Sequence, residues 1–386
     1  MTFLPRFPLY DRTMTVDGVS EVVFYDLPER RLARAGLTLS RRLENGQGVW
    51  YLELPRVDGE PFVVEQIGGP VTPPPEVRRV LPAFLRNGSG PERIADGLET
   101  EVVEIDDPIG RLRSLVGRQY SSILRHDPGV RLDLEPEDVH AIRVAARRAR
   151  AMLRAARPML DPSWAEPLRD ELKWLGGSLG RRRDLDVLIA RLRSEIDGLD
   201  QPERTAAAVL LERLGDERET AQAIAVDALR SDRYFALLDQ LESAARGPRV
   251  RRGEVSLRKL ARKEFRRLRT VADALAPSST DDDLHRARIL GKRARYTAEL
   301  AESEVGEPAL RVVQRAKVFQ DVLGAHQDAI VAEARLRELR SDLGSSGAAF
   351  AAGRLVERER ERRRQARAQL PRAWRRLDRA AKRAFG

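Results

Sequence analysis

The stretch Val139–Arg154, VHAIRVAARRARAMLR, occurs in the chain in two related copies. From Leu284 the sequence reads LHRARILGKRARYTAEL, and the two stretches align without a gap. The matched pairs lie 145 positions apart, and they are His140 with His285, Arg143 with Arg288, Arg147 with Lys292, Arg148 with Arg293, and Arg150 with Arg295. Two of the four histidines in the chain open these copies.

A second pair of matching segments follows the first with nearly the same spacing. Residues 173–180 (KWLGGSLG) match residues 317–324 (KVFQDVLG) at an offset of 144. A period that changes by one residue over this distance indicates a structural repeat. Each copy, of about 140 residues, is long enough to form a helical bundle.

The composition limits the possible classes of protein. The chain has 386 residues, 42% of them hydrophobic, which is enough for one large core or two moderate ones. Its 70 Lys and Arg against 60 Asp and Glu give a net charge of +10, which favours a polyanionic partner. The absence of cysteine excludes disulfides and thiolate metal sites. Because the sequence has no long apolar run and no signal-peptide pattern, we expect a cytoplasmic protein.

The local pattern changes along the chain. Residues 1–70 contain short β-branched or aromatic runs at 21–25, 37–42 and 49–54, which predict a small β-rich module. The proline-rich and glycine-rich stretches of residues 71–107 predict a linker. From 108 to 386 the apolar spacing is helical, and we expect about eight helices plus a basic tail, in repeat halves of about 108–247 and 248–386.

Turn-forming residues and capping groups predict the ends of these helices. Breaks are expected near 127–129, 161–162, 176–177, 198, 247–248, 276–280, 306 and 344. Acidic or hydroxyl side chains at 135–138 and 278–283 can accept hydrogen bonds from free N–H groups at a helix start. Both copies of the repeated stretch are therefore expected in the first turns of a helix.

Each copy separates into two faces when placed on a helical wheel. The basic stripe of the first copy consists of His140, Arg143, Arg147, Arg150 and Arg154. The basic stripe of the second copy consists of His285, Arg288, Lys292 and Arg295. The adjacent face of the first copy is apolar, with Ile142, Ala145, Ala149, Met152 and Leu153. We expect the apolar face to pack and the basic stripe to remain accessible.

The first basic stripe contains no acid, which points to an anionic ligand. Like charges at i, i+4 each cost a few tenths of a kcal/mol, and a bound anion offsets that cost. The planar fork of arginine suits phosphate oxygens. The alternative is that these cations pair with acids of neighbouring helices, namely Asp184, Asp186 and Asp328. Arg148 and Arg293 lie on the other side of the wheel and are expected to be structural.

The histidines are interpreted as polar residues. No second histidine, cysteine or acid follows His140 or His285 at i+3 or i+4, so neither copy predicts a metal site. We expect His140 and His285 to assist the basic stripes. His126 and His326 are expected to be ordinary polar residues.

The two copies, followed by LGRRRDLDVL and LGAHQDAIV, resemble the two halves of the CHAD family, the conserved histidine α-helical domain. This resemblance covers about residues 108–386. It implies a mainly α fold of two pseudo-symmetric four-helix bundles that bind inorganic polyphosphate and associate with polyphosphate granules. Carried over by position, the ligand-facing residues are His140, Arg143, Arg147, Arg150, Arg154, His285, Arg288, Lys292 and Arg295, with Lys173 and Lys317 added.

The N-terminal module resembles part of the CYTH family of triphosphate tunnel metalloenzymes. Residues 24–28 (FYDLP) and 32–39 (LARAGLTL) carry this resemblance, which covers about residues 20–66. The metal-holding ExExK glutamates are absent, and Ser40 stands where the family has the first arginine of LRxR, although Arg42 matches the second. Glu53 stands where a lysine is common. We therefore expect a truncated, inactive remnant.

Non-enzymatic polyphosphate binding without a cofactor is the leading hypothesis. Residues 108–386 contain no nucleophile–base pair, phosphate-cradling glycine loop or acidic metal cluster recognisable in the sequence. The first alternative is a metal-dependent triphosphatase or polyphosphatase in the N-terminal module. The second is non-specific nucleic-acid binding, since an aromatic content of 5% argues against sequence-specific recognition. The basic segment 354–382 contains interspersed glutamates and predicts a solvated helix with local ion pairs.

Overall fold

The computed structural model describes residues 19–56, 59–86, 88, 90–93, 108–198, 200–251, 255–341 and 346–386. These form two compact units, which are considered separately. The first unit combines the described residues of 1–104 with 118–145 and 226–239, and the second combines those of 105–117 with 146–225 and 240–386. Four helices contribute to both units: α4 (Pro108–Leu132), α5 (Pro136–Ala155), α8 (Gln201–Arg230) and α9 (Asp232–Arg246).

The first unit contains an antiparallel sheet in the order β4-β3-β2-β1-β5. Its strands are β1 (Val19–Asp26), β2 (Thr38–Glu44), β3 (Gln47–Leu54), β4 (Phe62–Ile67) and β5 (Glu92–Arg93). The three strands predicted from sequence are confirmed as β1, β2 and β3. Asn45 and Gly46 join β2 to β3 with φ of 49° and 80°, values that suit a tight hairpin turn.

The described part of the expected linker at 71–107 folds with this sheet. It contains α2 (Pro75–Val80) and α3 (Pro82–Leu85), in which Val77 and Phe84 are fully buried. β5 pairs with β1, and the Tyr25 hydroxyl donates to the Pro70 carbonyl oxygen at 2.8 Å. Proline suits the first turn of a helix, where no N–H is required, so the proline run that predicted a stiff spacer begins α2 instead.

The helical segments of the first unit are held to the sheet module by polar contacts. Arg125 Nε donates to the Ala35 carbonyl oxygen at 2.8 Å, and Arg86 Nε donates to Asp239 Oδ1 at 2.7 Å. These contacts place parts of the helical repeat in the same compact unit as the sheet. The compact units therefore do not follow the boundary at residue 107 that the sequence pattern indicates.

The helix break expected at residues 127–129 is absent, because α4 continues through Pro128 to Leu132. Asp127 is fully buried and accepts hydrogen bonds from Arg131 Nε at 2.6 Å and from the Tyr234 hydroxyl at 2.9 Å. A proline removes one backbone hydrogen bond from a helix. The Asp127 contacts hold this turn in place, and the chain reverses later, at Asp133 with φ of 52°.

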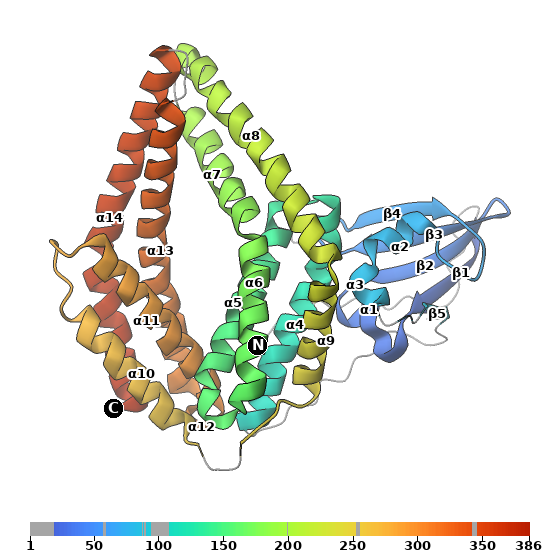
Figure 1. The fold of residues 1–386 in the computed structure, drawn as a ribbon, viewed down its shortest axis with the longest axis horizontal. Helices are drawn as coiled ribbons and strands as arrows, with labels where there is room; N and C mark the ends of the chain where they lie inside the picture. Colours follow the sequence, from blue (N-terminus) through green and yellow to red (C-terminus); the bar gives the residue numbers. More distant parts are fainter. Residues whose placement is uncertain are drawn as a thin grey trace. The chain divides into compact units, whose positions relative to one another are not determined.

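The second unit contains the rest of the two repeats (Figure 1). Its further helices are α6 (Pro162–Ser178), α7 (Gly180–Ile196), α10 (Leu257–Ala272), α11 (Asp281–Leu300), α12 (Glu302–Val305), α13 (Glu307–Ser341) and α14 (Ser346–Phe385). At the 145-residue offset, α13 spans the same positions as α6 and α7 together, and α14 begins where α8 begins. The first repeat is interrupted at Leu179, two residues after the expected break at 176–177.

Among the described residues, each repeat thus supplies four helical runs besides the short α12, namely α4, α5, α6–α7 and α8–α9 in the first and α10, α11, α13 and α14 in the second. This confirms the mainly α architecture with a small N-terminal sheet. The segment expected as a basic tail is the fourth run of the second repeat. Trp374 and Leu377 of α14 are buried, while Arg360 with Glu357 and Arg364 with Glu361 form the local ion pairs that the sequence predicts. The tail is therefore a core helix with a solvated face.

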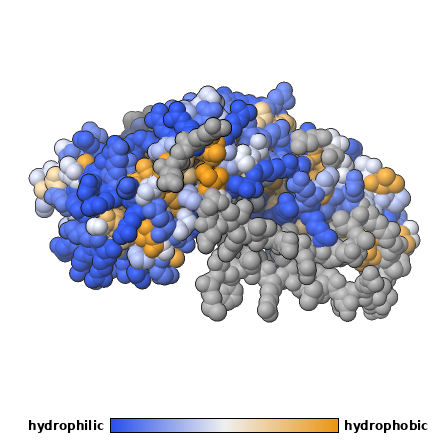
Figure 2. Space-filling model, turned by 90° about the horizontal axis from the view of Figure 1, so that it is seen from below, coloured by the Kyte–Doolittle hydropathy of each residue, from blue (hydrophilic) through white to orange (hydrophobic). Residues whose placement is uncertain are grey.

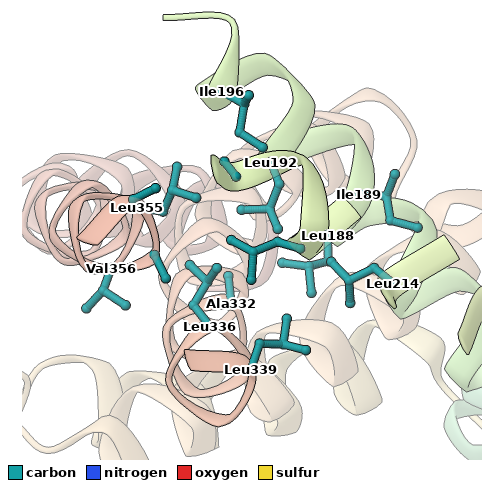
Figure 3. Packing of buried hydrophobic residues seen from close by; sticks show 14 of the residues in the cluster. Leu188, Ile189, Leu192, Ile196, Leu214, Ala332, Leu336, Leu339, Leu355 and Val356 are labelled. Atoms are coloured by element: carbon teal, nitrogen blue, oxygen red, sulfur yellow. The ribbon is translucent and has the colours of Figure 1, made fainter. Parts of the chain in front are cut away.

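A hydrophobic cluster joins the repeats within the second unit (Figure 3). Leu188, Leu192 and Leu214 come from α7 and α8, and Leu336 and Leu355 come from α13 and α14. Ion pairs also cross between the repeats, with Arg191 Nη1 2.9 Å from Glu359 Oε2 and Arg358 Nη1 2.6 Å from Glu195 Oε2. The burial of apolar surface makes this cluster a main source of stability for the unit.

On the face seen in Figure 2, the described residues are mostly hydrophilic, with scattered apolar positions. None of the helices in the described part of the chain is both long and apolar enough to cross a membrane.

Replacing Leu336 by Ala is expected to lower the free energy of unfolding by about 2–5 kcal/mol, because the side chain is fully buried in the cluster and its loss leaves a cavity. Val209→Ala is the matched control, since Val209 lies on α8 with 45% of its surface exposed. Urea unfolding followed by circular dichroism measures both. Equal stability of the two variants would contradict the role of the cluster.

Candidate anion-binding site

The second basic stripe lies on α11, whose start is fixed by a capping box. The Thr280 hydroxyl accepts from the Asp283 backbone N–H at 3.2 Å, and Asp283 Oδ2 accepts from the Thr280 N–H at 3.0 Å. The two reciprocal bonds satisfy free N–H groups and set the register of the helix. The expectation that both copies occupy the first turns of a helix is confirmed, because α5 begins at Pro136 and α11 at Asp281.

Three cations from the two repeats form a group in the second unit, here called the central cluster: Arg147 of α5, with Arg288 and Lys292 of α11. Burial, together with the positive charges of Arg288 and Arg147, lowers the pKa of Lys292 to about 8. Burial, together with the charge of Arg147, also lowers the pKa of Arg288. None of the three side chains forms a hydrogen bond or salt bridge with a described residue.

Asp186 and Asp328, two of the three acids proposed as structural partners of these cations, form no salt bridge with the central cluster. Asp328 of α13 raises the pKa of Lys292 and of Arg288 through its charge, yet it forms no salt bridge with either within the described chain. Asp186 is buried and pairs with Arg182 and with Arg218, the latter at 3.0 Å. The central cluster therefore has excess positive charge without a direct counterion among the described residues.

The sequence also predicts that Arg295 faces the ligand, but its guanidinium forms a hydrogen bond and a salt bridge within the protein. Arg295 Nη1 donates to Gln320 Oε1 at 2.9 Å, and Arg295 Nε lies 3.3 Å from Glu299 Oε1. Gln320 Nε2 in turn donates to the Gly291 carbonyl oxygen at 3.0 Å. Arg295 thus ties α11 to α13 at the edge of the central cluster, a role that the wheel of one helix does not reveal.

The two arginines expected to be structural differ from each other. Arg148 Nη2 of α5 lies 3.2 Å from Glu299 Oε2 of α11, which confirms its structural role. Arg293 has no side-chain hydrogen bond or salt bridge with any described residue, and its charge lowers the pKa of Arg154. Burial is the largest cause of that shift, and Arg169 and Arg150 add to it. We call Arg150, Arg154, Arg169 and Arg293 the lateral cluster.

The other predicted residues have varied environments. His140 and Arg143 belong to the part of α5 in the first unit and make contacts of their own. His285 is exposed, with Nδ1 3.4 Å from Gln327 Oε1. Lys173 of α6 and Lys317 of α13 are exposed.

The two remaining histidines were expected to be ordinary polar residues, but both are engaged. His326 is buried with 3% exposure, and its Nε2 accepts from Arg367 Nε at 3.1 Å and lies 3.3 Å from Asp281 Oδ1. Burial and the charge of Arg367 lower the pKa of His326. In the first unit, His126 Nδ1 lies 2.7 Å from Asp138 Oδ1. His326 thus helps to link α11, α13 and α14. In the described part of the chain, no group of acids and histidines is arranged to hold a metal ion.

The CHAD domain family model matches residues 114–337, so the chain belongs to the CHAD domain family. Two uncharacterized Mycobacterium tuberculosis proteins, Rv2226 and MT2285, are each 33% identical to it over 291 residues. The matches cover 72% of this chain and 54% of those proteins, so the chain spans about half the length of these relatives.

Two solved structures share the fold. PptA from Streptomyces chartreusis superimposes with a TM-score of 0.57 at 26% identity, covering 69% of this chain and 99% of that protein. The CHAD domain from the plant Ricinus communis gives a TM-score of 0.57 at 23% identity, covering 73% of this chain and 97% of the plant domain. The second likeness supports the fold alone.

The pKa of Lys292 is expected to be about 8 and to respond to its neighbours in opposite directions. Arg288→Gln should raise the pKa because it removes a repelling charge, whereas Asp328→Asn should lower it because it removes an attracting one. NMR titration of the labelled lysine side chain measures both shifts. Shifts of the same sign in the two variants would contradict the geometry.

The ionisation of Lys292 also affects the stability of the protein. The folded-state pKa lies below the value of 10.5 for a free lysine, so the unfolded chain binds more protons between about pH 8 and 10.5. The free energy of unfolding should therefore gain a positive contribution from Lys292 as the pH rises through that window. Lys292→Met should lack this contribution.

Proposed function

We propose that the chain binds inorganic polyphosphate without catalysing its turnover. The central cluster is the observation that carries the proposal, because Arg147, Arg288 and Lys292 come from both repeats and have no ion-pair partner among the described residues. Membership of the CHAD family and the net charge of +10 support it. Association with polyphosphate granules in the cytoplasm is part of the same proposal.

A polyanion would relieve the electrostatic cost of the central cluster. Burial and mutual repulsion both lower the pKa of Lys292, so the unliganded protein holds this charge at a cost. Phosphate oxygens offer paired acceptors to Arg147 and Arg288 and a counter-charge to Lys292. Binding should therefore restore the proton affinity of Lys292, which couples polyphosphate binding to proton uptake near pH 8.

We also propose that the N-terminal module is a degenerate CYTH-like remnant without triphosphatase activity. Arg42, the residue that matches the second family arginine, lies 3.4 Å from Glu53 and stacks 4.3 Å from the Tyr51 ring centroid. Glu53 thus offers this guanidinium an internal counterion. The described strands form an open sheet with β4 and β5 at its edges.

The enzymatic alternative predicts a measurable activity. We expect no phosphate release from triphosphate or polyphosphate in the presence of magnesium or manganese, because the metal-holding glutamates are missing. A phosphate-release assay on the full chain tests this directly. Turnover by the wild type that is lost in Arg42→Ala would establish the N-terminal module as a catalyst.

Binding of nucleic acid is the second alternative, since basic helices also attract DNA and RNA backbones. The low aromatic content favours polyphosphate, because single-stranded nucleic acids are usually held by stacking on aromatic side chains. Competition at equal phosphate concentration separates the two ligands. If long-chain polyphosphate fails to displace DNA or RNA, the assignment is wrong.

Charge reversal of the central cluster is expected to abolish binding. The triple variant Arg147→Glu, Arg288→Glu and Lys292→Glu should bind long-chain polyphosphate at least 100-fold more weakly, since each lost charge-assisted contact costs about 1.5–3 kcal/mol. Titration calorimetry at several salt concentrations measures the affinity and its salt dependence.

Arg204→Glu is the control for a general effect of charge, because Arg204 is an exposed residue of α8 outside both clusters. Its affinity should stay close to that of the wild type. Circular dichroism of the triple variant separates lost binding from lost folding. A folded triple variant with wild-type affinity would refute the site.

A further inference from the structure

The two positions that correspond to Arg148 and Glu299 in the aligned repeats both carry positive charges. At the 145-residue offset, Arg148 corresponds to Arg293 and Glu299 corresponds to Arg154. Arg148 and Glu299 form a salt bridge at 3.2 Å, whereas Arg293 and Arg154 carry like charges. Burial, together with repulsion by Arg293, lowers the pKa of Arg154. The same pair of aligned positions therefore forms an ion pair between Arg148 and Glu299 and brings two like charges together at Arg293 and Arg154.

The two acids near these arginines are only partly engaged, and Glu264 Oε2 has no hydrogen-bond partner. Glu264 of α10 attracts Arg154, but its Oε1 accepts from Arg267 Nη1 at 2.6 Å. Glu166 of α6 pairs with Arg169 and lies 3.2 Å from Arg157.

The arginines themselves have few partners. Arg150, Arg154 and Arg293 form no side-chain hydrogen bond or salt bridge within the described chain. The Nε atoms of Arg293 and Arg169 are buried without an acceptor. Four arginines thus lie near two acids, Glu166 and Glu264, and the lateral cluster keeps an excess of positive charge.

The lateral cluster continues the central cluster along one helix. Arg147, Arg150 and Arg154 share one stripe of α5, and the seven residue steps from Arg147 to Arg154 correspond to a rise of about 10 Å. On the opposite side Arg295, the counterpart of Arg150, is held by Glu299 and Gln320. Positive charge without a direct counterion therefore continues from the central cluster along α5 to Arg154. Along α11 it does not continue, because Glu299 pairs with Arg295.

We propose that Arg150, Arg154, Arg169 and Arg293 form a second phosphate subsite, and that it takes a later segment of the chain held by the central cluster. This proposal rests on the proposed function and adds the direction in which the bound chain continues from the central cluster. An anion must reach about 10 Å to occupy both clusters, so the lateral cluster strengthens the binding of long chains and not of pyrophosphate. Glu299 closes the equivalent position in the other repeat.

Arg154→Glu tests the subsite because it places at position 154 the residue type that the aligned position 299 already has. The new carboxylate would pair with Arg293 and reverse the charge of the subsite. We expect roughly tenfold weaker binding of long-chain polyphosphate, a salt slope reduced by about 1–2, and unchanged affinity for pyrophosphate. The melting temperature should not fall, because a repulsion is replaced by an attraction. Arg204→Glu makes the same change of charge outside the subsite.

Glu299→Gln provides the reciprocal test while keeping the side-chain size at this buried position. It removes the negative charge that closes the other side and pairs with Arg148 and Arg295, while Arg295 keeps its hydrogen bond to Gln320. Affinity for long-chain polyphosphate should rise several-fold, with a steeper salt dependence. Weaker binding by a folded Glu299→Gln variant would overturn the closing role of Glu299.

The outcomes separate the subsite from the function on which it rests. If Arg154→Glu behaves like Arg204→Glu while the triple variant of the central cluster loses binding, the second subsite is refuted and polyphosphate binding stands. If the wild type binds no polyphosphate, both proposals fall. If Arg154→Glu weakens long-chain and pyrophosphate binding equally, the two clusters form one site, and the directional proposal is refuted.

Discussion

Repulsion between like charges at the junction of α5 and α11 is the constraint on which this site depends. Arg147, Arg288 and Lys292 remain together although burial and mutual repulsion disfavour the charge of Lys292. Other faces of the same helices offset that cost, with Met152 and Leu153 of α5 and Ala294 of α11 fully buried. The salt bridge of Arg148 with Glu299 adds a direct tie between the helices. The apolar face of each copy thus makes its basic stripe possible.

Much of the fold follows from local chemistry in the sequence. The alternating runs give β1 to β3, the Thr280 capping box starts α11, and the 145-residue period gives matching helices in the two repeats. The failures occur where distant residues override a local signal. Pro128 remains inside α4 because Asp127 of that turn bonds to Tyr234, more than a hundred residues later. No pattern near residue 128 contains this partner.

The site is less predictable than the helices that carry it. A helical wheel separates basic from apolar faces on one helix, and it places Arg147 on the basic stripe of α5 and Arg288 and Lys292 on that of α11. It cannot show that Arg295 meets Gln320 of α13, or that Arg293 approaches Arg154, because those contacts depend on how helices pack. One signal was nevertheless available: the aligned copies place arginine at 154 against glutamate at 299. A comparison of the aligned copies thus points to positions where the two repeats make different contacts.

The hydrophobic cluster that joins the repeats also sets an order for synthesis. Leu188 of α7 and Val356 of α14 belong to this one cluster although 168 positions separate them. At the usual rates of translation, roughly 10 to 30 s pass between the synthesis of the two residues. Until α13 is made, the apolar surfaces of α7 and α8 have no partner from the second repeat. The nascent chain is most vulnerable to aggregation while the cluster is incomplete, and completion of α14 ends this interval.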